Sequence, residues 1–271
     1  MTYDPLVPGG AEDYPVKVGS MLLTLVDPHR GFEKAYNRWY ERDHFYGGCL
    51  AGPYLFSGKR WVATKDLKAK RFPTESPITP APEIGSYLAV YWVLEGTHDD
   101  WNRWSVDQVQ MLHRDGRMFQ ERDHIHTVLY EFRWDLNRDA DGVPVELALE
   151  HPYQGMVVVI GERNDDTDMG DVDAWFQQHL PGVIGGTRIG QVAAFNAMPL
   201  LDDAPPDVPR DPATDRRFLQ LWFVEDDAAA AWSSVESAAK AFDDSGLGRV
   251  VFASPFKTTI PGTDTYTDQL W

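Results

Sequence analysis

The chain has 271 residues, of which 43% are hydrophobic and 13% aromatic, so it can bury the core of one large domain or two small ones. Its net charge of −17 argues against nucleic acids and anionic membranes as partners, because binding either requires concentrated Lys and Arg. The single cysteine, Cys49, excludes a disulfide framework, and no apolar run is long enough for a membrane span, so we expect a cytoplasmic protein without a leader peptide.

The first half predicts the order strand, helix, strand, strand, helix, strand. The apolar run 20–26 is typical of a strand buried on both faces, and the aromatic residues of 31–48 recur at helical spacing before two glycines. Alternating and β-rich runs indicate the other strands. The predicted elements are strands at 20–26, 54–64, 86–95 and 123–134 and helices at 31–48 and 99–116.

The second half repeats this order. His44 aligns with His179, and Trp92 aligns with Phe223. The corresponding elements are strands at 155–162, 188–198, 217–225 and 248–260 and helices at 168–182 and 226–246. We therefore divide the chain into an N-terminal unit, a linker, and a C-terminal unit with an extended tail, at residues 1–134, 135–153 and 154–271.

Each unit predicts an α+β, ferredoxin-like fold, with a four-stranded antiparallel sheet and both helices on one face. The other face of the sheet would then be bare. Strands that are apolar on both sides do not tolerate that exposure, at ~25 cal/mol per Å² of apolar surface. The two sheets should therefore pack together within one chain as a barrel.

A motif at the end of the first helix of each unit carries a family resemblance. In W-Y/F-x-x-(x)-H, the histidine precedes a glycine-rich turn and then "GKRWVA" or "AAFNAM". This pattern resembles the dimeric α/β-barrel superfamily, including EthD-like proteins, cofactor-free antibiotic-biosynthesis monooxygenases, muconolactone isomerases and polyketide cyclases. The resemblance covers roughly residues 20–134 and 154–260 and implies a tandem fusion of two units. In the second unit, "QHLPGV" is the more typical version of the motif, whereas "DHFYGG" in the first unit departs from it. The resemblance implies the architecture and does not choose a reaction, since such folds host diverse chemistry.

His44 is the first candidate for catalysis. On a helix, Asn37 and Tyr40 share its face and Glu41 lies beside it, so this polar face could border a cleft between helix and sheet. The helix C-terminus and a nearby carboxylate, Glu41 or Asp43, would favour the protonated imidazole and make it an acid or base near neutrality. The alternative is a histidine that only caps the helix.

His124 and His126 form a second candidate site on the last strand of the first unit. Alternation would place both imidazoles on one face, where they could line a ligand pocket, hold a metal with a third ligand such as His113, or simply pack. The tetrapeptide ERDH ends at both His44 and His124, so both histidines could serve one cleft. No signature supplies a third metal ligand, so no metal is predicted.

An aromatic and cationic pocket is the third candidate feature. Trp61 and Trp92 could contact a flat substrate while Arg60 binds its carboxylate or enolate oxygen, although aromatic residues on a sheet usually fill core. The basic loop with Lys65, Lys68, Lys70 and Arg71 is either a solvated loop or a lid that attracts an anionic substrate. The predicted substrate-binding residues are Asn37, Arg60, Trp61, Trp92, His113 and His126.

These features favour an enzyme without a cofactor that moves protons on a small aromatic, polyketide-like or lactone-type substrate, as an isomerase, cyclase, dehydratase or related lyase. His44 would be the general acid/base, helped by Tyr40 and Asp43, and His124 a second proton-transfer or orienting group. Two alternatives stay open: a monooxygenase that is cofactor-free or holds haem, and a non-catalytic barrel that binds small molecules. Association as a homodimer is also left open.

Overall fold

The computed structural model describes residues 15–271, so the first 14 residues of the expected N-terminal unit, on which the leader-peptide prediction rests, lie outside the described part. The N-terminal unit has the predicted element order, with a short extra helix, α2, after its second strand. Its elements are β1 (Val18–Pro28), α1 (Glu33–Trp39), η2 (Tyr40–Leu50), β2 (Leu55–Val62), α2 (Lys65–Lys68), β3 (Tyr87–Leu94), α3 (His98–Arg114) and β4 (Arg122–Asn137).

The C-terminal unit repeats the arrangement after a short turn of helix, η3, in the connecting segment. Asp168 caps α4 by accepting a hydrogen bond from the backbone N–H of Gly170 at 2.7 Å. The elements are η3 (Val145–Leu147), β5 (Gly155–Arg163), α4 (Met169–Ile184), β6 (Ile189–Met198), β7 (Arg217–Val224), η4 (Ala228–Ala231), α5 (Trp232–Asp244) and β8 (Gly248–Thr258).

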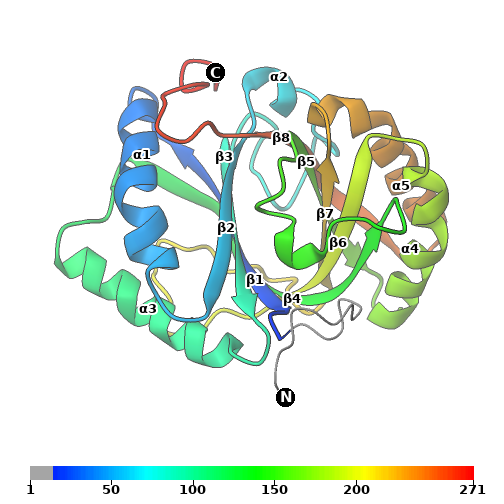
Figure 1. Ribbon diagram of the computed structural model, residues 1–271, viewed down its shortest axis with the longest axis horizontal. Helices are drawn as coiled ribbons and strands as arrows, with labels where there is room; N and C mark the ends of the chain where they lie inside the picture. Colours follow the sequence, from blue (N-terminus) through cyan, green and yellow to red (C-terminus); the bar gives the residue numbers. More distant parts are fainter. Residues whose placement is uncertain (1–14) are drawn as a thin grey trace.

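The eight strands close into one antiparallel barrel in the order β1-β3-β2-β8-β5-β7-β6-β4 (Figure 1). Each unit contributes four consecutive strands in the ferredoxin-like order, β4-β1-β3-β2 and β8-β5-β7-β6. The units meet edge to edge at two seams, a short one between β2 and β8 and a long one between β4 and β6. The sheet faces that carry no helices thus form the interior of the barrel and are buried there, as expected.

Apolar side chains from both units fill the barrel interior, together with the segment that connects them. Val145, Ala148 and Leu149 of this segment are buried in the interior core, and the Nε1 of Trp92 donates to the carbonyl of Val145 at 3.1 Å. Figure 1 shows η3 lying inside the ring of strands. The connection between the units is therefore part of the core.

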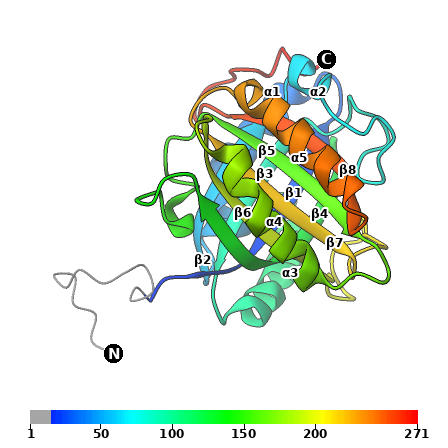
Figure 2. The same cartoon turned by 90° about the vertical axis from the view of Figure 1, so that its right-hand side faces the viewer.

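Two pairs of helices cover the outside of the barrel. Helices α1 and α3 lie on one side with η2, and α4 and α5 lie over the strands of the second unit (Figures 1 and 2). Each helix layer has its own apolar core against the sheet. Within residues 15–271, none of the helices combines the length and the apolar character that crossing a bilayer requires.

Two local features differ from the sequence predictions. β4 extends to Asn137, three residues into the predicted linker, because its last residues pair with β6. The division of the chain at 134 and 153 otherwise stays a proposal. The predicted helix 31–48 is α-helical only as far as Trp39, and Tyr40–Leu50 winds as a π-helix, which changes the spacing of side chains on each face.

Candidate functional site

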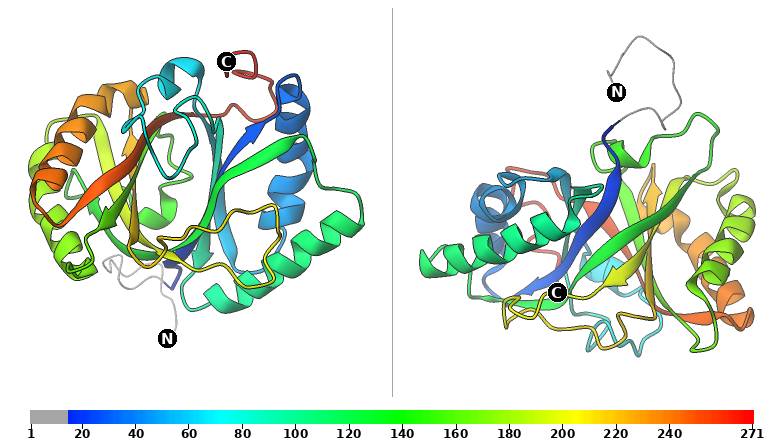
Figure 3. Two further views of the ribbon diagram at one scale, coloured as in Figure 1. Left: turned by 180° about the vertical axis from the view of Figure 1, so that it is seen from behind. Right: turned by 90° about the horizontal axis from the view of Figure 1, so that it is seen from below.

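A cavity of about 110 Å³ lies between the helices of the N-terminal unit and the outer face of its sheet. Its walls come from η2, α3, β1 and β4, and residues 200–208 from the β6–β7 loop of the second unit also line it. Figure 3 shows this loop running beside the helices of the N-terminal unit. Most of the lining is apolar. Its polar side chains are Thr24, Tyr40, His44, Asn102, Ser105, Arg122, His124, Thr127 and Asp207. A small, mainly apolar molecule with few polar groups suits such a cavity.

His44 lies on η2 and stacks on Trp39, with ring centroids 4.7 Å apart. Its Nδ1 is buried and has no hydrogen-bond partner in the described part of the chain. Burial lowers the pKa of His44 to about 3, so the prediction of a protonated imidazole is wrong. Gly48 makes room for the ring, because a Cβ there would lie 2.6 Å from Nδ1.

Tyr40 and Asp43 do not hydrogen-bond to His44. The hydroxyl of Tyr40 shares a hydrogen bond of 2.9 Å with the hydroxyl of Tyr91, and its ring meets the imidazole edge-on with centroids 5.3 Å apart. Burial raises the pKa of Tyr40 well above its ordinary value, so it stays protonated. Asp43 pairs with Arg117 near the surface and does not line the cavity. Tyr40 therefore packs against His44, and the predicted helper role of Asp43 has no geometric basis.

His124 lies across the cavity in a chain of polar contacts. Its Nε2 is 3.2 Å from the Nη2 of Arg122, and its Nδ1 is 2.8 Å from the hydroxyl of Thr127. Because a guanidinium only donates, Nε2 must accept, which leaves the proton on Nδ1. Burial, with the Arg122 cation beside it, lowers the pKa of His124 to about 4. His124 is thus neutral and fixed in one tautomer, as an orienting role requires.

Asp207 brings the second unit into contact with this chain. Its carboxylate lies 3.4 Å from the Nη2 of Arg122 and 4.0 Å from the Nε2 of His124. Asp203 on the same loop forms a separate surface pair with Arg103 at 2.9 Å. Two ion pairs therefore connect the β6–β7 loop to the N-terminal unit, and only the one with Arg122 lies at the cavity.

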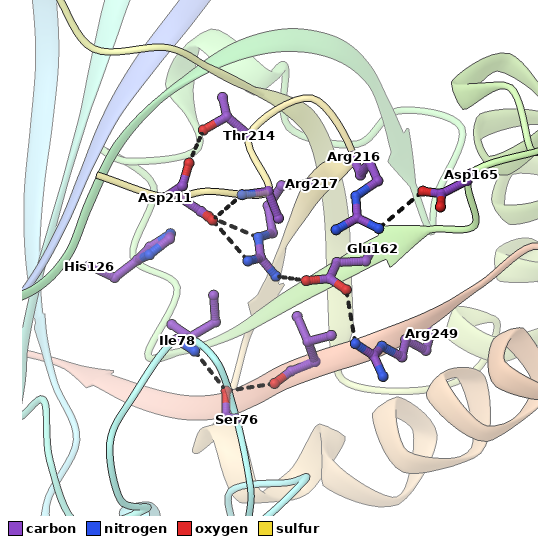
Figure 4. Close-up of polar contacts among 12 residues, drawn as sticks. Ser76, Ile78, His126, Glu162, Asp165, Asp211, Thr214, Arg216, Arg217 and Arg249 are labelled. Carbon is purple, nitrogen blue, oxygen red and sulfur yellow. Dashed lines mark hydrogen bonds and ion pairs between the residues drawn. The ribbon is translucent and has the colours of Figure 1, made fainter. Parts of the chain in front are cut away.

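His126 is on the opposite face of the sheet from His124, so the prediction that they share a face is wrong. The register of β1 with β4 shifts between His124 and His126, because Ile125 is an extra residue in a β-bulge. His126 lies in the barrel interior, 2.8 Å from the hydroxyl of Tyr130, and burial lowers its pKa to about 4. Figure 4 shows its imidazole near Asp211. The two imidazoles cannot share a metal or a pocket.

Asn37 and Arg60 form a separate buried cluster and do not line the histidine cavity. The Nη1 of Arg60 donates to the Oδ1 of Asn37 at 3.0 Å and lies 3.4 Å from Glu41. Asn37 also donates to the carbonyl of Thr263, and Glu41 accepts from the backbone of Gly262. The C-terminal arm and the change in helical winding turn Asn37 and Glu41 away from His44.

Three other predicted substrate contacts are absent from the cavity. Trp61 and Trp92 are completely buried in the barrel interior, where inward-facing strand positions place them, and Trp92 stacks on Phe195 with centroids 5.6 Å apart. His113 is exposed near the end of α3 and is not among the residues that line the cavity. None of the three therefore lines the cavity, contrary to the sequence-based expectation.

Sequence reasoning missed Arg122, Asp207 and the threonines beside His124. Arg122 is itself part of the second ERDH, and alternation on the strand places it on the face of His124. This signal was available. Asp207 carried no such signal, because its loop comes from the other unit and reaches the cavity only in the folded barrel.

The equivalent region of the second unit is packed with aromatic residues. Phe176 and Phe242 stack with centroids 4.7 Å apart, and Phe218 contacts both. His179, which aligns with His44, is exposed and stacks on Trp175 with centroids 4.1 Å apart. The two units thus share a fold and differ in how the space between helices and sheet is filled.

No protein-family profile and no curated protein matches this sequence. Solved structures do match its fold. A chlorite dismutase-like protein has a TM-score of 0.54 and 12% identity, covering 94% of this chain and 100% of its own. An anthrone oxidase-like protein has a TM-score of 0.50 and 8% identity, covering 92% and 95%. A dye-decolorizing peroxidase from Bacteroides thetaiotaomicron has a TM-score of 0.50 and 10% identity, covering 95% and 97%. The chain therefore has the ferredoxin-like, dimeric α/β-barrel fold, with two units in tandem.

Haem, which the sequence left open, does not fit the histidine cavity. The cavity measures about 110 Å³, whereas pockets for organic ligands of drug size begin at about 300 Å³. The Nδ1 of His44 also lacks the partner that normally orients a metal-bound imidazole. Within residues 15–271, no group of three metal-binding side chains lies close enough together to hold a metal ion.

Proposed function

We propose that the chain is a cofactor-independent enzyme that moves a proton on a small ring compound carrying an enolisable carbonyl or a phenolic hydroxyl, in an isomerase-, cyclase- or dehydratase-type reaction. The observation that carries this proposal is the buried, unpartnered Nδ1 of His44 in a mostly apolar cavity next to Arg122. A buried polar atom without a partner costs free energy, and a ligand donor or acceptor would remove that cost.

His44 acts as the base in this proposal. The imidazole is neutral at pH 7, so it can accept a proton from the substrate. Its pKa of about 3 reflects the cost of an isolated charge in a buried site. A substrate anion formed at the same moment would sit beside the new imidazolium, and this mutual attraction offsets part of that cost.

Arg122 takes the role that the sequence assigned to Arg60, holding the anionic oxygen. Its side chain is only 5% exposed, and its guanidinium lies over Trp39 at 5.5 Å from the ring centroid. A fixed cation in a water-poor cavity stabilises a developing oxyanion more strongly than the same cation in water. His124 and Asp207 position this guanidinium through the contacts described above.

The test is deuterium exchange at the carbon next to the carbonyl of β-tetralone, followed by NMR. Native protein should accelerate exchange, and His44→Ala should reduce the protein-dependent rate about 100-fold or more, as for loss of a general base. His179→Ala is the matched control, because it removes the aligned but exposed imidazole of the second unit. Unchanged exchange in a folded His44→Ala variant would remove the proposal, as would native protein that accelerates exchange of neither β-tetralone nor dimedone.

A cofactor-free monooxygenase is the second candidate, favoured by the fold likeness to an anthrone oxidase-like protein. The same deprotonation would give a carbanion that reduces dioxygen, so that a CH₂ group and O₂ become a carbonyl group and water. The substrate supplies all the electrons. Oxygen uptake with β-tetralone that requires His44 would select this reaction, and exchange without uptake would select proton transfer alone.

A further inference from the structure

A second pocket, which we call the basic pocket, lies at the far end of α1 from the histidine cavity. It is formed by Arg30, Lys65, Lys68, Leu270 and Trp271 with the loop at 82–84, and its volume is about 380 Å³. It shares no lining residue with the histidine cavity. Figure 1 shows the C-terminal arm passing between α1 and α2, and its last two residues line the pocket.

The basic pocket carries positive charge in a chain whose net charge is −17. Three of its lining residues are cationic and one, Glu83, is acidic. Arg30 and Lys65 form no salt bridge or side-chain hydrogen bond within the part of the chain that the structure describes. Since the protein pairs many of its arginines with carboxylates, two unpaired cations at one pocket favour an external anion.

Lys68 forms the inner wall. The residue is 2% exposed, and its ammonium donates to the carbonyl of Glu83 at 2.6 Å and to the hydroxyl of Ser86 at 3.0 Å. The buried carboxyl of Asp27 lies behind it and also accepts from Ser86. An ammonium has three N–H donors, and these contacts use two of them.

The uncharged part of the lining is apolar, and Trp271 is fixed in place. Its Nε1 donates to Glu33 at 2.7 Å, and the charged ends of Arg30 and Lys68 lie 5.1 Å and 4.8 Å from its ring centroid. Leu270 is 1% exposed and closes the pocket beside it. An aromatic body can therefore pack in the pocket while its charged end reaches the cations.

We propose that the basic pocket binds a small organic anion, a carboxylate carried on an apolar ring. The apolar walls favour an organic anion over inorganic phosphate, and the volume is within the range of small-molecule sites, which begins at about 300 Å³. Two lysines of the basic loop that the sequence offered as a lid, Lys65 and Lys68, thus face this pocket and not the histidine cavity.

The experiment titrates the full chain with β-naphthoate, using calorimetry and the indole N–H signal of Trp271, assigned with Trp271→Phe. Native protein should bind with a shift of that signal. The double variant Arg30→Gln/Lys65→Gln should bind at least about tenfold more weakly, as expected when the charge-assisted contacts of two cations are removed. Lys70→Gln should match native protein, because it removes one charge from the same loop outside the pocket.

Two further probes test the chemistry of the anion. The uncharged β-naphthylmethanol and inorganic phosphate should each bind more weakly than β-naphthoate. The proposal is overturned if β-naphthylmethanol binds as tightly as β-naphthoate, if the double variant binds like native protein, or if the Trp271 signal does not move. These outcomes do not depend on turnover, so they are independent of the function proposed for the histidine cavity.

Discussion

Three buried histidines should make this protein lose stability as the pH falls below 6.5, the ordinary pKa of the group. Burial holds the pKa of His44 at about 3 and those of His124 and His126 at about 4. At pH 7.5 the imidazoles are neutral in both the folded and the unfolded chain, so they contribute no difference. Below pH 6.5 the unfolded chain binds protons that the folded chain does not, and unfolding is favoured.

The size of the effect follows from these pKa values. Each imidazole costs about 1.4 kcal/mol of unfolding free energy per pH unit between its unfolded and folded pKa. At pH 4.5 each should therefore cost roughly 2–3 kcal/mol, and the three together about 8 kcal/mol. This sum is comparable with the whole stability of a typical domain, about 5–15 kcal/mol.

The assay is urea unfolding at pH 7.5 and 4.5 for native protein, His44→Gln and His179→Gln. The loss of unfolding free energy between the two pH values should be smaller in His44→Gln by roughly 2–3 kcal/mol, because one buried imidazole has been removed. It should be the same in His179→Gln, whose imidazole is exposed. An equal loss in His44→Gln and native protein, or an NMR titration of His44 near pH 6.5, would refute the reasoning.

Two further substitutions, the second with a matched control, test the packing of the site and of the barrel. Gly48→Ala should push the His44 ring from its place, because the new Cβ would lie 2.6 Å from its Nδ1. It should lower the free energy of unfolding in urea by about 1–3 kcal/mol and slow the β-tetralone exchange. An unchanged exchange rate would contradict this. Glu162 accepts a buried hydrogen bond of 2.7 Å from the Nη1 of Arg217 (Figure 4). Glu162→Gln weakens this bond between charged groups and should lower the free energy of unfolding by about 2 kcal/mol. Asp165→Asn is the control, because the carboxylate that pairs with Arg216 is 87% exposed, and it should leave the free energy of unfolding almost unchanged. Equal losses in Glu162→Gln and Asp165→Asn would contradict this reasoning.

Local patterns predicted the elements and the fold. Apolar runs and helical spacing placed the eight strands and the principal helices, because burial of a strand or a helix face constrains residues that are close in the sequence. The duplicated order then predicted two ferredoxin-like units whose bare sheets must cover one another. The motif ending at His44 and His179 resembled the superfamily whose fold the solved structures share.

Side-chain direction at the site was less predictable, because single-residue irregularities decide it. One extra residue at Ile125 moves His126 into the barrel while His124 faces the cavity. The π-helix from Tyr40 changes which residues share a face with His44. Neither irregularity leaves a clear mark in the sequence, since both depend on the packing of neighbouring elements.

The sequence by itself determined the two units, their order of elements, and the pair of histidines in the repeated ERDH. Only the tertiary structure decided which polar groups meet at the cavity. Arg122 lies there while Arg60 is held by Asn37 and Glu41, and Asp207 arrives from the second unit. The physical reason is range: secondary structure follows from neighbours along the chain, whereas the cavity is enclosed by segments that meet only when the barrel closes.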